Sequence, residues 1–213
     1  MKVIIIGGSG DVGRRTVKEA LNRGHTVTAV TRTKKSLQQL PQTVKKIEAN
    51  INNISMFNDN IDNSDLIISA IRPSAGEEET LVLSTQAVLK AAANLNTRVL
   101  IVGGAARLKL NKESNETVLT SPGFLPEEII PIARACQAQY EVCLAEKEAD
   151  WTYISPPAML VPGIKTGHYR VGTDTLLTDQ EGHSHISMED FASAIMDEAE
   201  SPHHKNSAFT VAY

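Results

Sequence analysis

The residues with the clearest chemical meaning are the glycines in the first stretch of the chain, MKVIIIGGSGDVGRR. They fit two spacings, Gly7-x-x-Gly10-x-x-Gly13 and Gly8-x-Gly10-x-x-Gly13. A short apolar run precedes them and an amphipathic stretch follows, which is the strand–turn–helix context that a dinucleotide-binding motif requires. Free N–H groups at a helix start, together with the helix dipole, favour a pyrophosphate. We therefore expect cofactor contacts from Gly7, Ser9, Gly10, Asp11, Val12 and Gly13, with the Asp11 side chain turned away from the anion.

The end of the second apolar run, in AVTRTKK, indicates which dinucleotide is bound. A carboxylate at this place binds the ribose 2′-hydroxyl of NAD, whereas a basic residue pairs with the 2′-phosphate of NADP. The chain has Arg32 here, followed by Lys34 and Lys35, and no carboxylate. We expect Arg32, with Thr31 beside it, to contact a 2′-phosphate, so that NADPH is favoured and NADH remains possible. The two lysines are interpreted as a solvated helix start.

These motifs must be positioned by a parallel sheet. Short apolar runs rich in β-branched residues alternate with stretches of helical periodicity, which predicts an α/β fold of the Rossmann-like, doubly wound kind, mostly parallel, with helices on both faces. In such a sheet the ligand lies across the carboxyl ends of the strands, so Ala70, Ile71, Arg72, Gly103, Gly104 and Pro156 should line it. The predicted strands are 3–6, 26–31, 44–47, 66–71, 99–102, 151–154 and 208–211, and the predicted helices are 11–23, 78–94, 127–149 and 188–199.

Two segments lack clear periodicity. Residues 108–126 are predicted to form a long surface loop that could act as a lid, and residues 156–185 form a second irregular region. Ser187-Met-Glu-Asp190 has the pattern of a capping box and predicts the start of the last helix. We expect one NAD(P)-binding domain over residues 1–213, with a small substrate-side region built from 107–127 and 156–186.

A tyrosine–lysine pair for proton transfer is missing from the sequence. In a Tyr-x-x-x-Lys motif the lysine lowers the pKa of the tyrosine so that it acts as a general acid or base. Here the residues four places after Tyr140, Tyr153 and Tyr169 are Leu144, Pro157 and Thr173, and Tyr213 is the last residue. No catalytic residue is therefore assigned, and carbonyl reduction is disfavoured. Flavin reduction requires mainly proximity and orientation, because the reduced product can take its proton from water.

Composition narrows the partners. The net charge of −4 gives no positive field for nucleic acid or an anionic membrane, and no apolar run is long enough for a membrane span or a signal peptide. We expect a cytoplasmic monomer or homodimer that acts on a small molecule.

Cys136 and Cys143 are seven residues apart in a predicted helix, about 10 Å along its axis, which excludes a disulfide. No metal site is expected, because His183, His185, His203 and His204 lack further ligands at metal-binding spacing.

The sequence resembles atypical short-chain dehydrogenases of the NAD(P)H-binding, NmrA-like group, especially bacterial proteins named as candidate NADH-flavin reductases, and more distantly biliverdin reductase B. The resemblance covers nearly the whole chain. It rests on IIGGSGDVGRR, VLIVGGAARL, DWTYISPPAMLVPGIKTGHYRVGTDTLL, GHSHISMEDFASAIMDE and HHKNSAFTVAY.

The resemblance implies hydride transfer from NAD(P)H to a flavin or a similar planar acceptor such as a quinone, with flavin as substrate rather than tightly bound cofactor. The alternative is a non-catalytic NAD(P)-sensing regulator of the NmrA-like type. Asn50 stands where many relatives have an aspartate near the adenine, and Arg107 stands in GGAARL where relatives commonly have serine. The expected substrate-side residues are Arg107, Pro157 and Tyr169.

Overall fold

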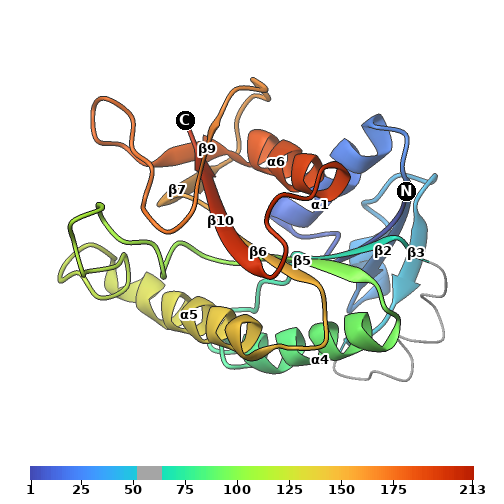
Figure 1. The fold of residues 1–213 in the computed structure, drawn as a ribbon. Helices are drawn as coiled ribbons and strands as arrows, with labels where there is room; N and C mark the ends of the chain where they lie inside the picture. The colour runs from blue at the N-terminus through green and yellow to red at the C-terminus, as the bar shows by residue number, and fades with distance from the viewer. Residues whose placement is uncertain (52–63) are drawn as a thin grey trace.

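A mostly parallel sheet forms the centre of the computed structural model, which describes residues 1–51 and 64–213. The strand order is β3-β2-β1-β4-β5-β6-β10-β8, and each neighbouring pair is parallel except β10 and β8 (Figure 1). This order confirms the predicted Rossmann-like α/β class. Strands β2 and β3 are added on one side of β1, and β4 and the later strands are added on its other side. The strands are β1 (Lys2–Ile6), β2 (Thr26–Thr31), β3 (Lys45–Glu48), β4 (Leu66–Ser69), β5 (Arg98–Val102), β6 (Trp151–Ser155), β8 (Arg170–Gly172) and β10 (Ser207–Ala212).

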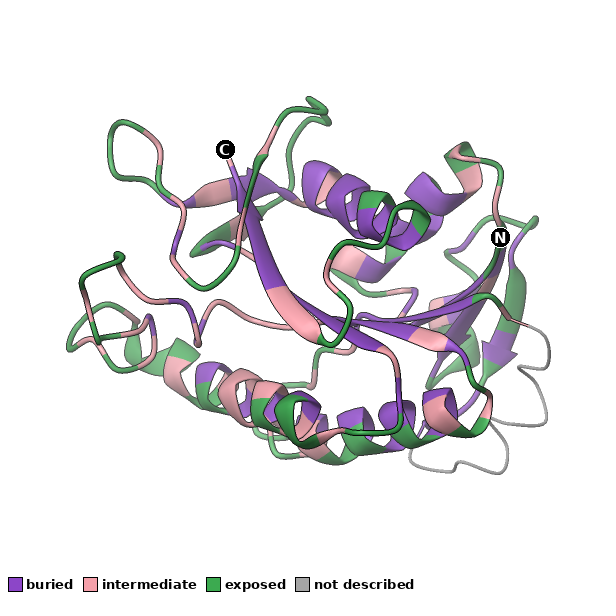
Figure 2. Cartoon of the chain, viewed as in Figure 1, coloured by how far each residue is buried: buried purple, intermediate pink, exposed green. Residues whose placement is uncertain are grey.

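Helices cover both faces of the sheet (Figure 1). On one face lie α1 (Asp11–Asn22) and α6 (Met188–Glu200), and on the other lie α4 (Thr80–Asn94) and α5 (Ile130–Ala145). Strand β1 serves both layers, since Val3 and Ile5 belong to the core under α1 and α6 while Ile4 and Ile6 belong to the core over α4 and α5. Figure 2 shows the consequence, with buried strands between helices that are exposed on their outer sides.

Several predicted boundaries shift. The helix expected over 127–149 is a short 3-10 turn, Glu127–Ile129, followed by α5, which ends at Ala145. It stops there because the carboxylate of Glu146 accepts hydrogen bonds from the amides of Lys147, Glu148 and Ala149. In a longer helix these amides would instead donate to backbone carbonyls of the preceding turn. A short helix, α2 (Lys34–Leu37), contains the two lysines that were interpreted as a helix start.

The two segments described as irregular are more ordered than expected. Residues 156–185 contain β7 (Met159–Val161), which pairs in parallel with β9 (His185–Ser187) in a separate two-stranded sheet, and they also contain β8. Within the segment 108–126, Leu108 and Val118 are buried against Leu176. Local periodicity misses these contacts, because strands of three residues carry too little pattern to be recognised.

The predicted cap of the last helix is present, since Ser187 Oγ accepts a hydrogen bond from the amide of Asp190 at 2.9 Å. Cys136 and Cys143 are both free, as their spacing predicts. Across the part of the chain that the structure describes, no helix combines the length and apolar character needed to cross a bilayer.

Candidate functional site

The carboxyl ends of the parallel strands bring most of the predicted site residues to one edge of the sheet. The glycine motif follows β1, Arg32 follows β2 and Asn50 lies just beyond β3. Farther along the same edge, the segment beginning at Ala70 follows β4, Gly103 follows β5 and Pro156 follows β6. Residues separated by up to about 150 positions in sequence thus meet at the place where open α/β sheets bind ligands.

Two of the motif glycines are required by the backbone itself. Gly7 has φ +76°, and a Cβ on it would lie 2.5 Å from the carbonyl oxygen of Ala70. A Cβ on Gly13 would lie 2.1 Å from the carbonyl oxygen of Gly7. These contacts let the first turn of α1 pack against the end of β1, and no other residue type fits.

Gly10 differs from both in degree, because a Cβ there would make one tight contact that a shift of a few tenths of an ångström would relieve. It is exposed, and a Cβ there would meet only the carbonyl oxygen of Gly7, at 3.3 Å. A glycine at this position keeps the surface low, so that a ligand can approach the backbone closely. Of the three glycines, Gly10 is therefore the one whose position best fits close approach of a pyrophosphate.

The start of α1 presents free hydrogen-bond donors beside Gly10. No side chain caps this helix, and Arg14 is the first residue whose amide bonds back, to the carbonyl of Gly10 at 2.9 Å. Among the described residues, no acceptor bonds the amides of Asp11, Val12 and Gly13. The Asp11 carboxylate pairs with Arg14 at 2.6 Å, so its charge is neutralised along the helix rather than aimed at an anion. This helix end fits a pyrophosphate.

Arg32 has a partner that sequence reasoning missed. Its guanidinium is largely exposed and lies 3.7 Å from the carboxylate of Glu77, which follows β4. Such an exposed pair is weak and can be exchanged for a ligand phosphate. Thr31 is buried, and its hydroxyl bonds the carbonyl of Thr33, which shapes the turn that carries Arg32. The signal for Glu77 was the run Glu77-Glu78-Glu79 after a predicted strand end.

Packing also requires glycine at positions 103 and 104. A Cβ on Gly103 would lie 1.9 Å from Cζ of Tyr153, and one on Gly104 would lie 2.8 Å from Sγ of Cys136. The buried Tyr153 hydroxyl donates to the carbonyl of Cys136 and accepts from the amide of Gly104, at 3.0 and 3.1 Å. Burial raises the pKa of Cys136 to about 11, so its thiol is not a nucleophile at neutral pH.

The remaining rim residues differ in how open they are. Arg72 and Asn50 are exposed, Ile71 and Pro156 are half-buried, and Ala70 is buried at the carbonyl that Gly7 approaches. Pro157, predicted on the substrate side, is buried.

Arg107 is fixed by three neighbours. Its Nε donates to Ser155 Oγ at 3.0 Å, its Nη2 donates to the carbonyl of Thr173 at 2.6 Å, and its guanidinium carbon lies 5.0 Å from the ring centre of Tyr140. Burial lowers the pKa of Arg107 from its ordinary value. The side chain thus joins the ends of β5 and β6, helix α5 and the segment after β8.

The two segments predicted to form the substrate side are joined to each other. Besides the Arg107 contact, the backbone amide of Lys109 donates to the carbonyl of Asp174, and the Lys109 carbonyl accepts from the amide of Leu176, both at 2.8 Å. Leu108, Val118 and Leu176 form a small buried cluster of their own. The predicted lid is therefore a packed unit that stands over the end of β5.

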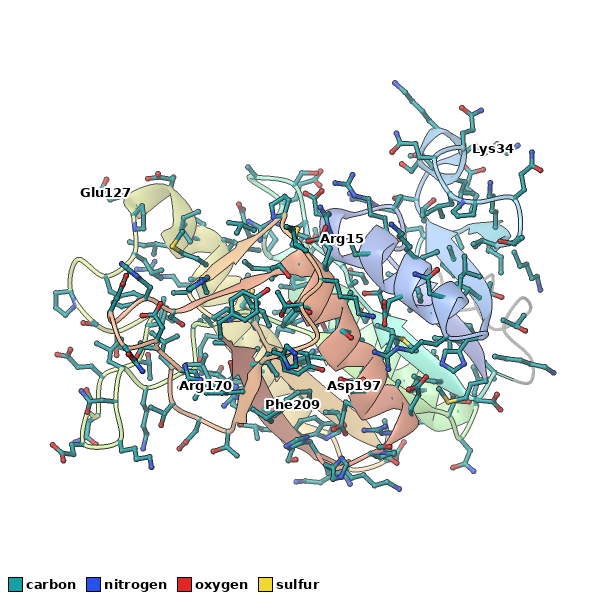
Figure 3. All side chains as sticks on the ribbon, turned by 90° about the horizontal axis from the view of Figure 1, so that it is seen from above. Arg15, Lys34, Glu127, Arg170, Asp197 and Phe209 are labelled. Atoms are coloured by element: carbon teal, nitrogen blue, oxygen red, sulfur yellow. The ribbon has the colours of Figure 1, made fainter. Side chains whose placement is uncertain are left out.

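Tyr169 is not brought to this edge. Its hydroxyl bonds the carboxylate of Asp197, which in turn pairs with Arg23 at 2.7 Å, just beyond the C-terminal end of α1. The glycine motif lies at the opposite end of that helix. In Figure 3, Arg15 lies near the start of α1 and Asp197 toward the far end of α6. The structure therefore gives Tyr169 a place apart from the site.

A carboxylate cluster that sequence reasoning treated only as a helix cap positions the segment after β7. The buried Asp190 accepts hydrogen bonds from the amides of Thr166 and Gly167 and from the Tyr213 hydroxyl, at 2.6 to 3.0 Å. Glu189 pairs with Arg15 on α1 at 2.6 Å. Lys165 pairs with Glu19, also on α1, at 2.6 Å. The signal was the acidic pair inside ISMEDF.

Each tyrosine of the chain contacts protein groups other than a lysine nitrogen in the described structure. The hydroxyls of Tyr153, Tyr169 and Tyr213 bond other protein groups, and the Tyr140 ring lies under Arg107. Within residues 1–51 and 64–213, no lysine nitrogen is hydrogen-bonded to a tyrosine hydroxyl.

Comparisons with known proteins agree with this geometry. Residues 7–202 match the model of a family described as NAD(P)H-binding. YwnB, an uncharacterized protein of Bacillus subtilis, is 34% identical over 213 residues, which cover 99% of this chain and 98% of the relative. A candidate epimerase from Bacteroides thetaiotaomicron is 35% identical with a TM-score of 0.90, covering 100% of this chain and 96% of that one.

A further solved structure, described as a candidate NADH-flavin reductase from Streptococcus pneumoniae, is 28% identical with a TM-score of 0.90 and covers 100% of this chain and 99% of that one. The family match extends over the glycine motif, the strand ends and most of the C-terminal region. The chain therefore belongs to the NAD(P)H-binding family.

Proposed function

We propose that this protein is an NAD(P)H-dependent oxidoreductase, with NADPH preferred, that transfers hydride to a flavin or a similar planar acceptor such as a quinone. The acceptor is a small molecule that binds as a substrate. Residues 107–127 and 156–186 form the substrate side of a single domain in this proposal. The description of one structural relative as a candidate NADH-flavin reductase supports this proposal.

The protein groups at the sheet edge fit a dinucleotide. The free amides at the start of α1 would hold the pyrophosphate over Gly10, and Arg32 would exchange Glu77 for a 2′-phosphate. When bound, the nicotinamide supplies a hydride from its C4 position. The turns after β4, β5 and β6 would form the floor under that ring, and the packed unit around Leu108 would limit the access of water.

The observation that carries the choice of acceptor is the absence of a tyrosine–lysine pair in the described structure. Reduction of an isolated carbonyl needs a proton donor for the alkoxide, which such a pair usually supplies. A flavin or quinone can accept the hydride and take its proton from water, so the protein needs mainly to hold the two rings together. The geometry at this edge suits that lesser requirement.

The test is a titration of the purified protein with NADPH and NADH, followed by NADPH oxidation with FMN, FAD, riboflavin and a quinone on the same sample. NADPH-preferring binding with acceptor-dependent oxidation supports the proposal. Equally tight binding without turnover on any acceptor would instead indicate the NAD(P)-sensing regulator. A protein that binds neither dinucleotide would contradict both.

A further inference from the structure

Four arginines of this chain are partly buried. Three of them pair with a glutamate, whereas Arg107 contacts only neutral groups. Arg15, Arg23 and Arg98 pair with Glu189, Glu19 and Glu198, at 2.6, 2.7 and 2.5 Å. For Arg107, no side-chain carboxylate of the described residues lies within ion-pair distance. Among the described carboxylates, Asp174 acts on it electrostatically, from beyond ion-pair distance. Arg107 is therefore a partly desolvated cation without a counter-ion.

The protein holds this cation in place through neutral groups. Ser155 Oγ and the carbonyl of Thr173 accept from Nε and Nη2, and Tyr140 lies against the guanidinium. Nη1 and the second proton of Nη2 have no acceptor among the described residues. A guanidinium presents five donors in a rigid fork. Arg107 thus keeps pre-oriented donors available for a planar or tetrahedral anion.

A partly buried charge without a partner is unfavourable, since burial disfavours the charged form. A bound anion would relieve this, and it would do so in the ground state, before any hydride moves. The feature therefore points to a group that is already negative when it arrives. A ring that becomes anionic only on reduction would not compensate the charge in the binding step.

The position of Arg107 separates this anion from the dinucleotide pyrophosphate. The free amides of α1 lie at the end of β1, whereas Arg107 is bonded at the end of β6. In the sheet, β4 and β5 lie between these strands, so the two ends are about 14 Å apart at the usual strand spacing. The second anion site thus lies on the side of the acceptor.

We propose that Arg107 binds an acidic group of the acceptor, a carboxylate or a phosphate, and so selects anionic acceptors over neutral ones. This inference rests on the proposed function, because it assigns a substrate class to the same site.

The experiment compares acceptors that share a ring system and differ in whether they carry an acidic group. FMN and riboflavin share one ring system, and a naphthoquinone carboxylate and its methyl ester share another. Affinities are measured by fluorescence or absorbance titration with NADP⁺ at saturation, and KM values are measured with NADPH. We expect the wild type to bind the anionic member of at least one pair roughly tenfold or more tightly. That preference should decline with added salt. The pair that discriminates identifies phosphate or carboxylate as the group bound.

Three variants separate charge from structure. Arg107→Met should remove the preference, and Arg107→Lys should keep part of it, since it retains the charge but not the fork. Arg134→Met is the matched control, because it removes an exposed arginine of α5 by the same substitution; it should retain the preference. Thermal unfolding of each variant shows whether the protein is still folded. If Arg107→Met is unfolded, the salt dependence of the wild type and the Lys variant still provide the test.

Two results would overturn the inference. The first is equal affinity of the wild type for both members of each acceptor pair. The second is a loss of NADPH affinity in Arg107→Met as large as the loss of FMN affinity, which would assign the anion to the cofactor. If the dinucleotide binds and no acceptor is reduced, the proposed function fails, while the affinity ratios still decide the role of Arg107.

Discussion

Gly13 packs so closely on Gly7 that a Cβ on Gly13 would lie 2.1 Å from the carbonyl oxygen of Gly7. The same construction on Gly10 gives 3.3 Å to that oxygen and meets nothing else within 4 Å. The fold therefore requires Gly7 and Gly13, whereas we assign the requirement for Gly10 to a bound dinucleotide. Substitution can separate these two roles.

Gly13→Ala should destabilise the fold, whereas Gly10→Ala should mainly weaken dinucleotide binding. We expect a loss of about 3 kcal/mol or more in the free energy of unfolding for Gly13→Ala, since backbone must move. For Gly10→Ala we expect a loss of about 1 kcal/mol, because alanine is a poorer helix N-cap. Denaturant unfolding and calorimetric titration with NADPH check this. Equal stability losses, or unchanged NADPH affinity in folded Gly10→Ala, would contradict the assignment.

Arg32 and Glu77 should set the preference between the two dinucleotides. Arg32→Ala should lower NADPH affinity by about tenfold or more and leave NADH affinity nearly unchanged, since only NADPH carries the 2′-phosphate. Glu77→Gln should raise NADPH affinity a few-fold, because it removes a carboxylate 3.7 Å from the guanidinium. Parallel titrations with both dinucleotides give the ratio. Lys34→Ala, in α2, is the control and should change the ratio less.

Asp190 should contribute stability that depends on pH. Burial alone would raise its pKa, but the hydrogen bonds from Tyr213, Thr166 and Gly167 outweigh that effect and hold the pKa below its ordinary value. A carboxyl with a depressed folded-state pKa stabilises the protein above its unfolded pKa of about 3.9, and this contribution is lost as the pH falls through the folded value.

Asp190→Asn should therefore lower the free energy of unfolding at pH 7 by about 2–4 kcal/mol, because an amide cannot accept the same set of bonds. It should also make the loss of stability below about pH 4 shallower. Chemical denaturation between pH 7 and pH 2.5 measures both. Tyr213→Phe, which removes one donor, should lose about 1 kcal/mol. An unchanged pH profile in Asp190→Asn would show that other carboxylates account for the acid sensitivity.

Gly103 should be required for packing independently of any ligand. Gly103→Ala places a Cβ 1.9 Å from Cζ of Tyr153, so β6 or the turn after β5 must move, and we expect a loss of at least about 3 kcal/mol. Tyr153→Leu combined with Gly103→Ala should recover part of that loss, since the clash is with the ring. Thermal unfolding of the single and double variants gives the coupling. Purely additive losses would mean that the tyrosine ring is not the obstacle.

The parallel sheet and the glycine motif could be predicted from the sequence. Continuous β-branched runs alternate with helical periodicity, and this pattern is local, so β1, β2, β5, β6 and β10 were recognised within a residue or two. Their parallel arrangement then places the carboxyl ends of these strands at one edge. The residues that follow those ends can therefore be predicted to lie there. The positions of Arg32 and Gly10 at this edge can be predicted in this way.

Only the tertiary structure decided which residues act on each other across that edge. The pairing of Arg32 with Glu77, the fit of Tyr153 against Gly103, and the anchoring of Thr166 by Asp190 all join elements distant in sequence. The same is true of Arg107, for which placing its neighbours shows no carboxylate of the described residues within ion-pair distance. Local patterns record whether a residue is buried and in which element it lies, whereas hydrogen bonds, steric limits and unpaired charges depend on what packing places beside it.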